Sequence, residues 1–197
     1  MTELPGLDAY ARRYLAEARD ALAEPYILEG LRRAIPLLLD ARAARRNVFL
    51  FGNGGSASAA SHFVTDLAKV ASRGDGPRLR TIALSDNIPS MTAIANDLDY
   101  ARVFSDQLRV LGLPGDVAIA ISGSGNSPNV LQAVTVAQEL GIRTIGLTGI
   151  GGGKLKGMVD VPIVVPSNSM QHVEDVHVSI LHLVTAYLRD EGPVSTR

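Results

Sequence analysis

The chain has 197 residues, a formal net charge of −1 and no cysteine. This length is typical of one domain with a substantial core, and a charge this close to zero argues against nucleic acid or a membrane surface as the main partner. The lack of cysteine excludes disulfides, thiolate metal sites and cysteine nucleophiles. The first residues are polar and acidic, and no apolar run approaches the ~20 residues of a membrane helix, so we expect a soluble, cytoplasmic protein.

Two amphipathic helices are predicted before the first strand. The first covers residues 7–22 and is stopped by Pro25, and the second follows directly. Their apolar stripes consist of Tyr10, Tyr14, Ala18 and Ala21 in the first helix and of Leu28, Leu31, Ile35 and Leu38 in the second. This is more helix than one small sheet needs for cover. We therefore expect residues 1–46 to form an oligomer interface, and the alternative is a helical hairpin packed on its own domain.

A strand, a glycine-rich turn and a helix are predicted next, in direct succession. Residues 47–51 are a short apolar run, residues 52–55 form the turn, and the following residues have helical spacing with Ser56 placed to cap the helix. His62 and Asp66 stand at i and i+4 on one face of that helix. A turn of this kind presents backbone N–H groups to an anion at a helix N-terminus. We therefore predict a phosphate cradle and two titratable side chains on one element.

Four further short apolar runs alternate with helical segments. The predicted strands are residues 79–84, 117–121, 143–147 and 159–165, and the predicted helices are residues 89–95, 100–111, 128–140 and 170–190. Runs that are apolar throughout, rather than alternating, indicate a parallel sheet covered on both faces. The sequence therefore predicts an α/β fold with a five-stranded parallel sheet, followed by a frayed tail at residues 192–197.

Two turns rich in glycine and serine follow separate strands of the predicted sheet. The first is residues 52–56, and the other is residues 122–127, where Ser127 and Pro128 read as a cap and a first-turn proline. Ligands gather at the carboxyl ends of parallel strands. If the two strands are neighbours, the turns can hold one phosphate through backbone N–H groups and serine hydroxyls. The alternative is ordinary turn chemistry, because glycine and serine are common in turns.

The first turn also matches a dinucleotide-binding fingerprint. Gly52, Gly54 and Ala57 fit G-x-G-x-x-A, and Asp86 after the second strand is a possible ribose partner. A dinucleotide fold would not need the serine-rich turn at residues 122–127. This interpretation is therefore an alternative to phosphate binding and not the main prediction.

Asn96 and Asp97 follow the second strand, near the end of a predicted helix. Asn and Asp are common in turns that end helices. The same pair could instead contact sugar hydroxyls. The residues alone leave both interpretations open.

The histidines occur on two predicted helices, each with a carboxylate nearby. His62 with Asp66, and Glu174 with His182, could form a metal site with two histidines and two carboxylates, or an acid/base set that moves a proton between adjacent carbons. Glu174 and His182 lie roughly 12 Å apart along their helix, so both side chains must extend to share a metal. His177 is closer to Glu174 in sequence and is a rival ligand.

Several separate segments carry a family resemblance: GNGGSASAASHF, AIANDLDY, AISGSGNSPNVL, LTGIGGGKL and EDVHVSILH. They resemble the sugar isomerase (SIS) domain and, within that family, the phosphoheptose isomerases, over nearly the whole chain to about Leu188. The resemblance implies one SIS phosphosugar-binding domain at residues 47–197, built as a three-layer α/β/α sandwich of the flavodoxin type. It also implies a homotetramer with active sites at subunit interfaces.

The resemblance implies an activity and a set of site residues. The activity is isomerisation of sedoheptulose 7-phosphate to D-glycero-D-manno-heptose 7-phosphate, a step of heptose biosynthesis. Asp66 and His182 match the acid/base pair that passes a proton between C1 and C2 through an enediol. The positions that match substrate contacts are Asn53, Gly54, Gly55, Ser56, Asp66, Asn96, Asp97, Ser122, Gly123, Ser124, Ser127 and Glu174. The positions that match ligands of one Zn²⁺ per subunit are His62, Asp66, Glu174 and His182.

Four positions depart from the usual family pattern. Asp66 stands in place of a glutamate, Glu174 in place of a glutamine, Gln171 in place of an acid linked to ring opening, and Gly123 in place of a threonine. Asp66 has a shorter reach, and misplacement of about 1 Å can cost about 100-fold in rate. Glu174 adds a carboxylate that favours a divalent cation but repels phosphate when no metal is bound. Another ketose or aldose phosphate is therefore an open alternative as substrate.

The alternative from a different functional class is a non-catalytic protein that binds a phosphosugar or organises a replication initiator, as relatives within the family do. Such relatives keep the glycine and serine turns but tend to lose the catalytic histidine and acid. This chain keeps His62, Asp66 and His182. We therefore favour an enzyme.

Overall fold

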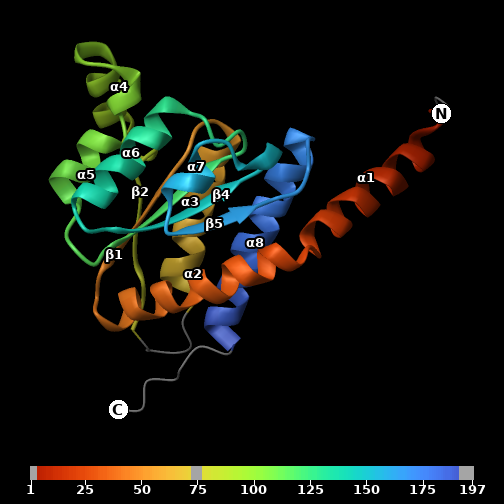
Figure 1. Ribbon diagram of the computed structural model, residues 1–197, viewed down its shortest axis with the longest axis horizontal. Helices are drawn as coiled ribbons and strands as arrows, with labels where there is room; N and C mark the ends of the chain where they lie inside the picture. Colours follow the sequence, from red (N-terminus) through yellow and green to blue (C-terminus); the bar gives the residue numbers. More distant parts are fainter. Residues whose placement is uncertain (1–3, 72–76, 191–197) are drawn as a thin grey trace.

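The computed structural model describes residues 4–71 and 77–190 (Figure 1). A single five-stranded parallel sheet lies at its centre, with the strand order β2-β1-β3-β4-β5. Its strands are β1 (Asn47–Phe51), β2 (Arg80–Ala83), β3 (Val117–Ser122), β4 (Arg143–Thr148) and β5 (Val161–Val164). This order confirms the predicted flavodoxin-type sheet, and it differs from the order of the dinucleotide-binding fold.

Helices cover both faces of the sheet and make the predicted three-layer sandwich. They are α1 (Leu7–Leu22), α2 (Pro25–Ala43), α3 (Gly55–Thr65), the π-helical turn η1 (Asp66–Val70), α4 (Ile88–Asp97), η2 (Tyr100–Arg102), α5 (Ser105–Leu111), α6 (Pro128–Glu139), η3 (Ile150–Gly152), α7 (Leu155–Met158) and α8 (Met170–Asp190). One core lies between the sheet and α2, α3 and α8, and the other between the sheet and α5, α6 and α7. Val48 and Leu50 of β1 face the first core, and Phe49 and Phe51 face the second.

The predicted strands and helices are found in the structure, and several of them differ in extent. The helix expected over residues 100–111 is divided, because η2 and α5 are separate elements with the buried side chains of Val103 and Phe104 between them. The short elements η3 and α7 after β4 were not predicted. The strand expected over residues 159–165 is shorter in the structure. The tail expected at residues 192–197 lies outside the described residues.

The two N-terminal helices pack differently. Helix α2 belongs to the sandwich core, since Ile27, Leu31 and Leu38 are buried with sheet residues. Helix α1 extends beyond the body of the molecule (Figure 1), and its only buried residue is Ala21. Helix α2 therefore packs on its own domain, whereas much of the apolar stripe of α1 is unburied, and the oligomer interface at residues 1–46 stays a prediction.

Helix α1 meets the sandwich at the start of α8. The Tyr14 hydroxyl donates to the Asp175 carboxylate over 2.6 Å, and this hydrogen bond raises the pKa of Tyr14 to about 12. The Tyr14 ring lies 4.1 Å from that of His172, whose Nδ1 is 3.7 Å from the Glu17 carboxylate. These polar contacts fix where α1 leaves the domain.

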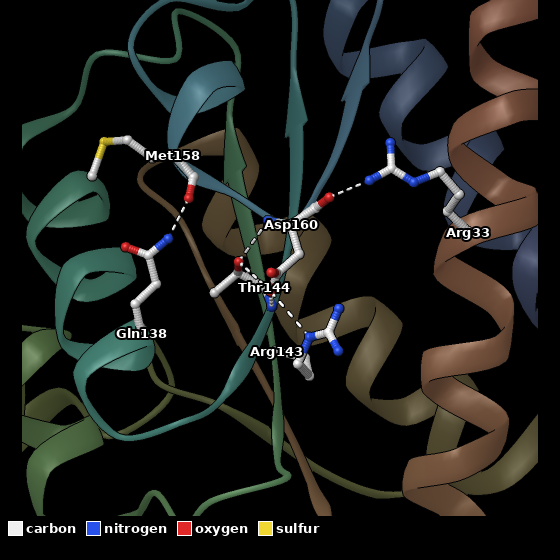
Figure 2. A network of polar contacts seen from close by, with 6 residues as sticks. All are labelled: Arg33, Gln138, Arg143, Thr144, Met158 and Asp160. Atoms are coloured by element: carbon white, nitrogen blue, oxygen red, sulfur yellow. Dashed lines mark hydrogen bonds and ion pairs between the residues drawn. The ribbon is translucent and has the colours of Figure 1, made fainter.

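A polar network closes the amino-terminal edge of β4 and β5 (Figure 2). The Asp160 carboxylate accepts from the backbone N–H and the hydroxyl of Thr144, at 2.8 and 3.0 Å, and lies 3.3 Å from the Arg143 guanidinium. Burial raises the pKa of Asp160, but these contacts outweigh it, so the pKa lies below its ordinary value. Arg33 of α2 donates to the Asp160 carbonyl, and Gln138 of α6 donates to that of Met158. The network holds the amino-terminal ends of β4 and β5 together. Ligands can bind at the opposite, carboxyl-terminal ends of the strands.

Within residues 4–71 and 77–190, no helix combines the length and the hydropathy needed to cross a membrane.

Candidate active site

The turn after β1 presents free backbone N–H groups at the start of α3. Gly54 takes the N-cap position with a φ of 53°, and the helix begins at Gly55. Among the described residues, the N–H groups of Asn53, Gly54 and Gly55 have no acceptor. The prediction that Ser56 caps α3 is wrong, because Ser56 lies buried inside the first helical turn and makes no cap bond. The predicted anion-binding turn is therefore built from backbone and not from a serine cap.

The turn after β3 has the same property and adds hydroxyl groups. The Ser122 and Ser127 hydroxyls lie 3.2 Å apart across the turn, and Ser127 is the N-cap of α6 without a side-chain cap bond. The N–H groups of Gly123, Ser124 and Ser127 have no partner within the described part of the chain. Free N–H groups at a helix N-terminus bind phosphate well. The Ser122–Ser127 turn is thus a suitable phosphate cradle.

Gly123 in the phosphate turn lies against the first residue of α8. A Cβ added at Gly123 would meet the Sδ of Met170, the first residue of α8. The thioether is the far end of a flexible side chain, and it would have to move to admit a larger residue. Gly123 and Met170 therefore form one packed unit beside the phosphate turn, which the sequence pattern did not reveal.

Three of the four predicted metal ligands come together where α3 meets α8. The Nε2 atoms of His62 and His182 lie 3.6 and 3.8 Å from Oδ2 of Asp66, and the two imidazole centroids are 5.0 Å apart. The ligand atoms of the three residues all lie within 4.8 Å of one another. Two imidazoles and a carboxylate are a donor set that suits a divalent metal such as Zn²⁺. The sequence correctly predicted that these distant segments meet.

A π-helical turn sets the direction of Asp66. Helix α3 ends at Thr65 and η1 begins at Asp66, whose carbonyl accepts from the N–H of Ala71 over 2.9 Å. Such turns insert one extra residue and are frequent at functional sites. The Asp66 side chain is mostly buried, with 18% of its surface exposed, whereas His62 and His182 are about half exposed. The acid is therefore held in place while the imidazoles are accessible.

Glu174 lies nearer the first turn than the histidine cluster. A Cβ added at Gly55 would be 2.8 Å from Glu174 Oε2, so this carboxylate covers the start of α3. Among the described residues the close group consists of His62, Asp66 and His182 without Glu174. The role of Glu174 as a fourth ligand stays a prediction.

His177 is not part of the close group either. It is buried, and neither ring nitrogen makes a hydrogen bond to the described residues. Burial lowers the pKa of His177 to about 4, with a smaller opposing effect from the backbone of Thr148. His177 is therefore a neutral imidazole at neutral pH, under the cleft between α3 and α8.

A cavity of about 190 Å³ lies between the start of α3 and α8. Its lining comprises Gly55, Ser56, Ala59, Ile121, Glu174, Asp175, His177 and Val178. Ala59 and Val178 also line the hollow that holds His62, Asp66 and His182. Ile121 directly precedes the phosphate turn. The cavity therefore lies beside the histidine cluster and beside the strand that leads into the phosphate turn.

The sugar-contacting pair predicted in α4 lies at the surface. The side chains of Asn96 and Asp97 are exposed and hydrogen-bond to each other over 2.7 Å. No contact of the described residues joins them to the first turn. Tyr100 does reach it, because its hydroxyl donates to Oδ1 of Asn53 over 3.1 Å. Asn129, whose amide bonds to Asn53 on its other side, was also missed by the sequence analysis.

Comparison with known proteins points to one family. The chain matches the SIS domain family over residues 10–149. It is 39% identical to the phosphoheptose isomerase of Paramagnetospirillum magneticum over 168 residues, which cover 85% of this chain and 84% of the relative. It is 43% identical to that of Trichlorobacter lovleyi over 137 residues, covering 70% and 69%. The solved phosphoheptose isomerase of Neisseria gonorrhoeae superposes with a TM-score of 0.83 at 32% identity, covering 92% of this chain and 96% of that one.

The buried His177 predicts an acid-sensitive fold. Its pKa of about 4 lies below the ordinary value of 6.5, so the unfolded chain takes up the proton first as pH falls. Stability is fully present above pH 6.5 and declines toward pH 4, by up to about 3 kcal/mol from this group. We expect His177→Gln to lose less stability than the unsubstituted chain over this range, in urea unfolding at each pH. If both proteins lost the same stability as pH falls, the lowered pKa of His177 would be contradicted.

Proposed function

Since the chain belongs to the SIS domain family and, within it, to the phosphoheptose isomerases, we propose that it converts sedoheptulose 7-phosphate to D-glycero-D-manno-heptose 7-phosphate. The observation that carries this proposal is the meeting of Asp66 and His182 beside a cavity that also adjoins the strand leading into the phosphate turn. An aldose–ketose isomerase needs both features. It must hold a phosphate at one end of an open chain and move a proton at the other.

Binding starts at the Ser122–Ser127 turn. Its free N–H groups and its hydroxyls donate to the phosphate oxygens, and the N-terminus of α6 favours the negative charge. The sugar then runs past Ser56 and Glu174 toward the histidine cluster. Fixing the phosphate in this way holds C1 and C2 beside Asp66. The reacting groups are then already positioned and do not have to meet by diffusion.

The proton transfer uses the free side of the Asp66 carboxylate. Both imidazoles approach Oδ2, and we assign Oδ1 to the substrate. In the direction from ketose to aldose, Asp66 removes a proton from C1 to give an enediol and returns it to C2. His182 moves the hydroxyl proton from O1 to O2, so the carbonyl shifts from C2 to C1 with no net gain or loss of protons.

We propose that His62, Asp66 and His182 hold one Zn²⁺ per subunit, with Glu174 extending from α8 as the fourth ligand. The support is the donor set and its spacing, since two imidazoles and a carboxylate within 4.8 Å suit this ion. When bound, the ion supplies positive charge that stabilises developing negative charge on the sugar oxygens. It would also neutralise Glu174, which otherwise stands beside the anion-binding start of α3.

We also propose a homotetramer in which residues 1–46 contribute to the interfaces. Helix α1 extends from the body of the molecule (Figure 1), and Leu7, Tyr10 and Leu15 on it are each more than half exposed, at 52, 57 and 67%. Helix α4 has no buried residue in one chain. We propose that neighbouring chains cover these helices and that the half-exposed histidines lie at a subunit interface.

The acid/base assignment predicts large losses of turnover from two substitutions. We expect Asp66→Asn and His182→Ala each to lower kcat at least about 100-fold, because each removes one proton-transfer group. Conversion of sedoheptulose 7-phosphate can be followed by NMR of the aldose product. Asp106→Asn, on α5 and away from the cleft, is the matched control and should retain activity.

Two results would argue against an isomerase with this acid/base pair. Turnover that survives both Asp66→Asn and His182→Ala would contradict the acid/base pair. Tight binding of sugar phosphates by the unsubstituted chain without turnover of any seven- or six-carbon ketose phosphate would favour the non-catalytic class.

The metal proposal predicts stoichiometric binding. We expect chelator-treated protein to take up one Zn²⁺ per chain in calorimetric titration, and His62→Ala to weaken this binding more than about tenfold. Glu174→Gln keeps the shape but removes the charge, so a weaker effect of the same sign is expected if Glu174 is the fourth ligand. Unchanged affinity in His62→Ala would contradict a site at the cluster.

A further inference from the structure

We infer that Asn129 is a positioning residue that holds the side chain of Asn53 in its working orientation. This inference rests on the proposed function, in which Asn53 contacts the sugar phosphate. Asn129 lies in the first turn of α6, directly beyond the phosphate turn, and is only 2% exposed. The family resemblance assigned it no role.

The two side chains form a closed pair of hydrogen bonds. The Asn53 Nδ2 donates to the Asn129 Oδ1 over 2.9 Å, and the Asn129 Nδ2 donates to the Asn53 Oδ1 over 2.8 Å. Asn53 follows β1, and Asn129 stands on the helix after β3, the neighbouring strand. The pair therefore joins the two turns that we propose to share one substrate.

Two further bonds fix which way each amide faces. The Asn129 Oδ1 also accepts from the backbone N–H of Val130 over 3.0 Å, and the Asn53 Oδ1 also accepts from the Tyr100 hydroxyl over 3.1 Å. Rotating either amide by half a turn would place NH₂ groups against these donors. A side-chain amide has two N–H donors, so the Asn53 Nδ2 keeps one free donor after bonding to Asn129. That donor has a fixed direction and is available to a substrate oxygen.

Loss of Asn129 would free the side chain of Asn53 to rotate. Asn53 lies in a turn and not on a helix, so without its partner its side chain can rotate, and of the described residues only Tyr100 still holds it. Misplacement of a contact group by about 1 Å can cost about 100-fold in rate. The role of Asn129 is thus indirect, through Asn53.

A double-mutant cycle separates this role from a structural one. We expect Asn129→Ala to lower kcat/KM for sedoheptulose 7-phosphate about tenfold or more in the natural background, but less than about twofold when Asn53 is already alanine. Thr135→Ala, which removes a hydroxyl bond on the exposed face of the same helix, is the control and should match the unsubstituted chain. An equal loss from Asn129→Ala in both backgrounds would overturn the inference.

A second variant covers the case in which Asn129→Ala does not fold. Asn129→Asp keeps the oxygen that accepts from Asn53 and Val130 but loses the donor to the Asn53 Oδ1. Because the new carboxylate oxygen stands against the Asn53 Oδ1, we expect it to lose kcat/KM about tenfold or more, and to lose less in the Asn53→Ala background. An Asn129→Asp protein with full activity would contradict the positioning role.

Calorimetric binding of sedoheptulose 7-phosphate tells failure of this inference from failure of the proposed reaction. If the unsubstituted chain binds the sugar phosphate without turnover, the isomerase proposal fails, and the same cycle on Kd still decides the role of Asn129. Non-additive changes in Kd would support it, and additive changes would overturn it. A chain that neither binds nor converts this sugar phosphate contradicts both proposals.

Discussion

Parallel pairing of β1 with β3 is the constraint on which the rest of this structure depends. The register Phe51 to Ala120 places the ends of two strands side by side, so the turns at Gly52–Gly55 and Ser122–Ser127 lie at one edge of the sheet. Because every strand runs in the same direction, the opposite edge is free for the Asp160 network. A sheet with the dinucleotide-binding order would not join these two turns in the same way.

The site combines rigid and accessible parts. The backbone of the two turns is fixed by glycine conformations and by the Asn53–Asn129 pair, and Asp66 is held at the start of a π-helical turn. His62 and His182 are half exposed at the end of the same cleft. This arrangement suits a reaction in which the phosphate end is held still while protons move at the other end. It also suits completion of the site by a neighbouring chain, as we propose.

Much of the fold could be predicted because it follows from the local spacing of apolar residues. Helices α1 and α8 have the predicted bounds, and the strand positions follow from short apolar runs between glycine-rich turns. The contact of His62 and Asp66 is also local, since i and i+4 share a helix face. That His182 joins them was inferred from the carboxylates that accompany the histidines on two predicted helices, and the family resemblance implied it as well. Nothing in the spacing of residues on one helix shows which other helix it meets.

The features that were missed depend on contacts between segments far apart in the chain. Ser56 looks like a cap in sequence, yet Gly54 takes that position because of its positive φ. Asn129 reads as an ordinary helix-start residue until Asn53 is seen beside it. In sequence Gly123 means only that a hydroxyl is missing from the phosphate turn, whereas the structure shows the Met170 thioether beside it. In each case the deciding partner is a backbone conformation or a distant side chain.

The most direct test of this account is a crystal structure of the protein with sedoheptulose 7-phosphate and Zn²⁺, with anomalous data collected at the zinc edge. The account predicts the phosphate within hydrogen-bonding distance of the Ser122–Ser127 turn, C1 and C2 beside Asp66, and an anomalous peak among His62, Asp66 and His182. A phosphate bound away from that turn, or a sugar whose carbonyl end lies away from Asp66, would contradict it.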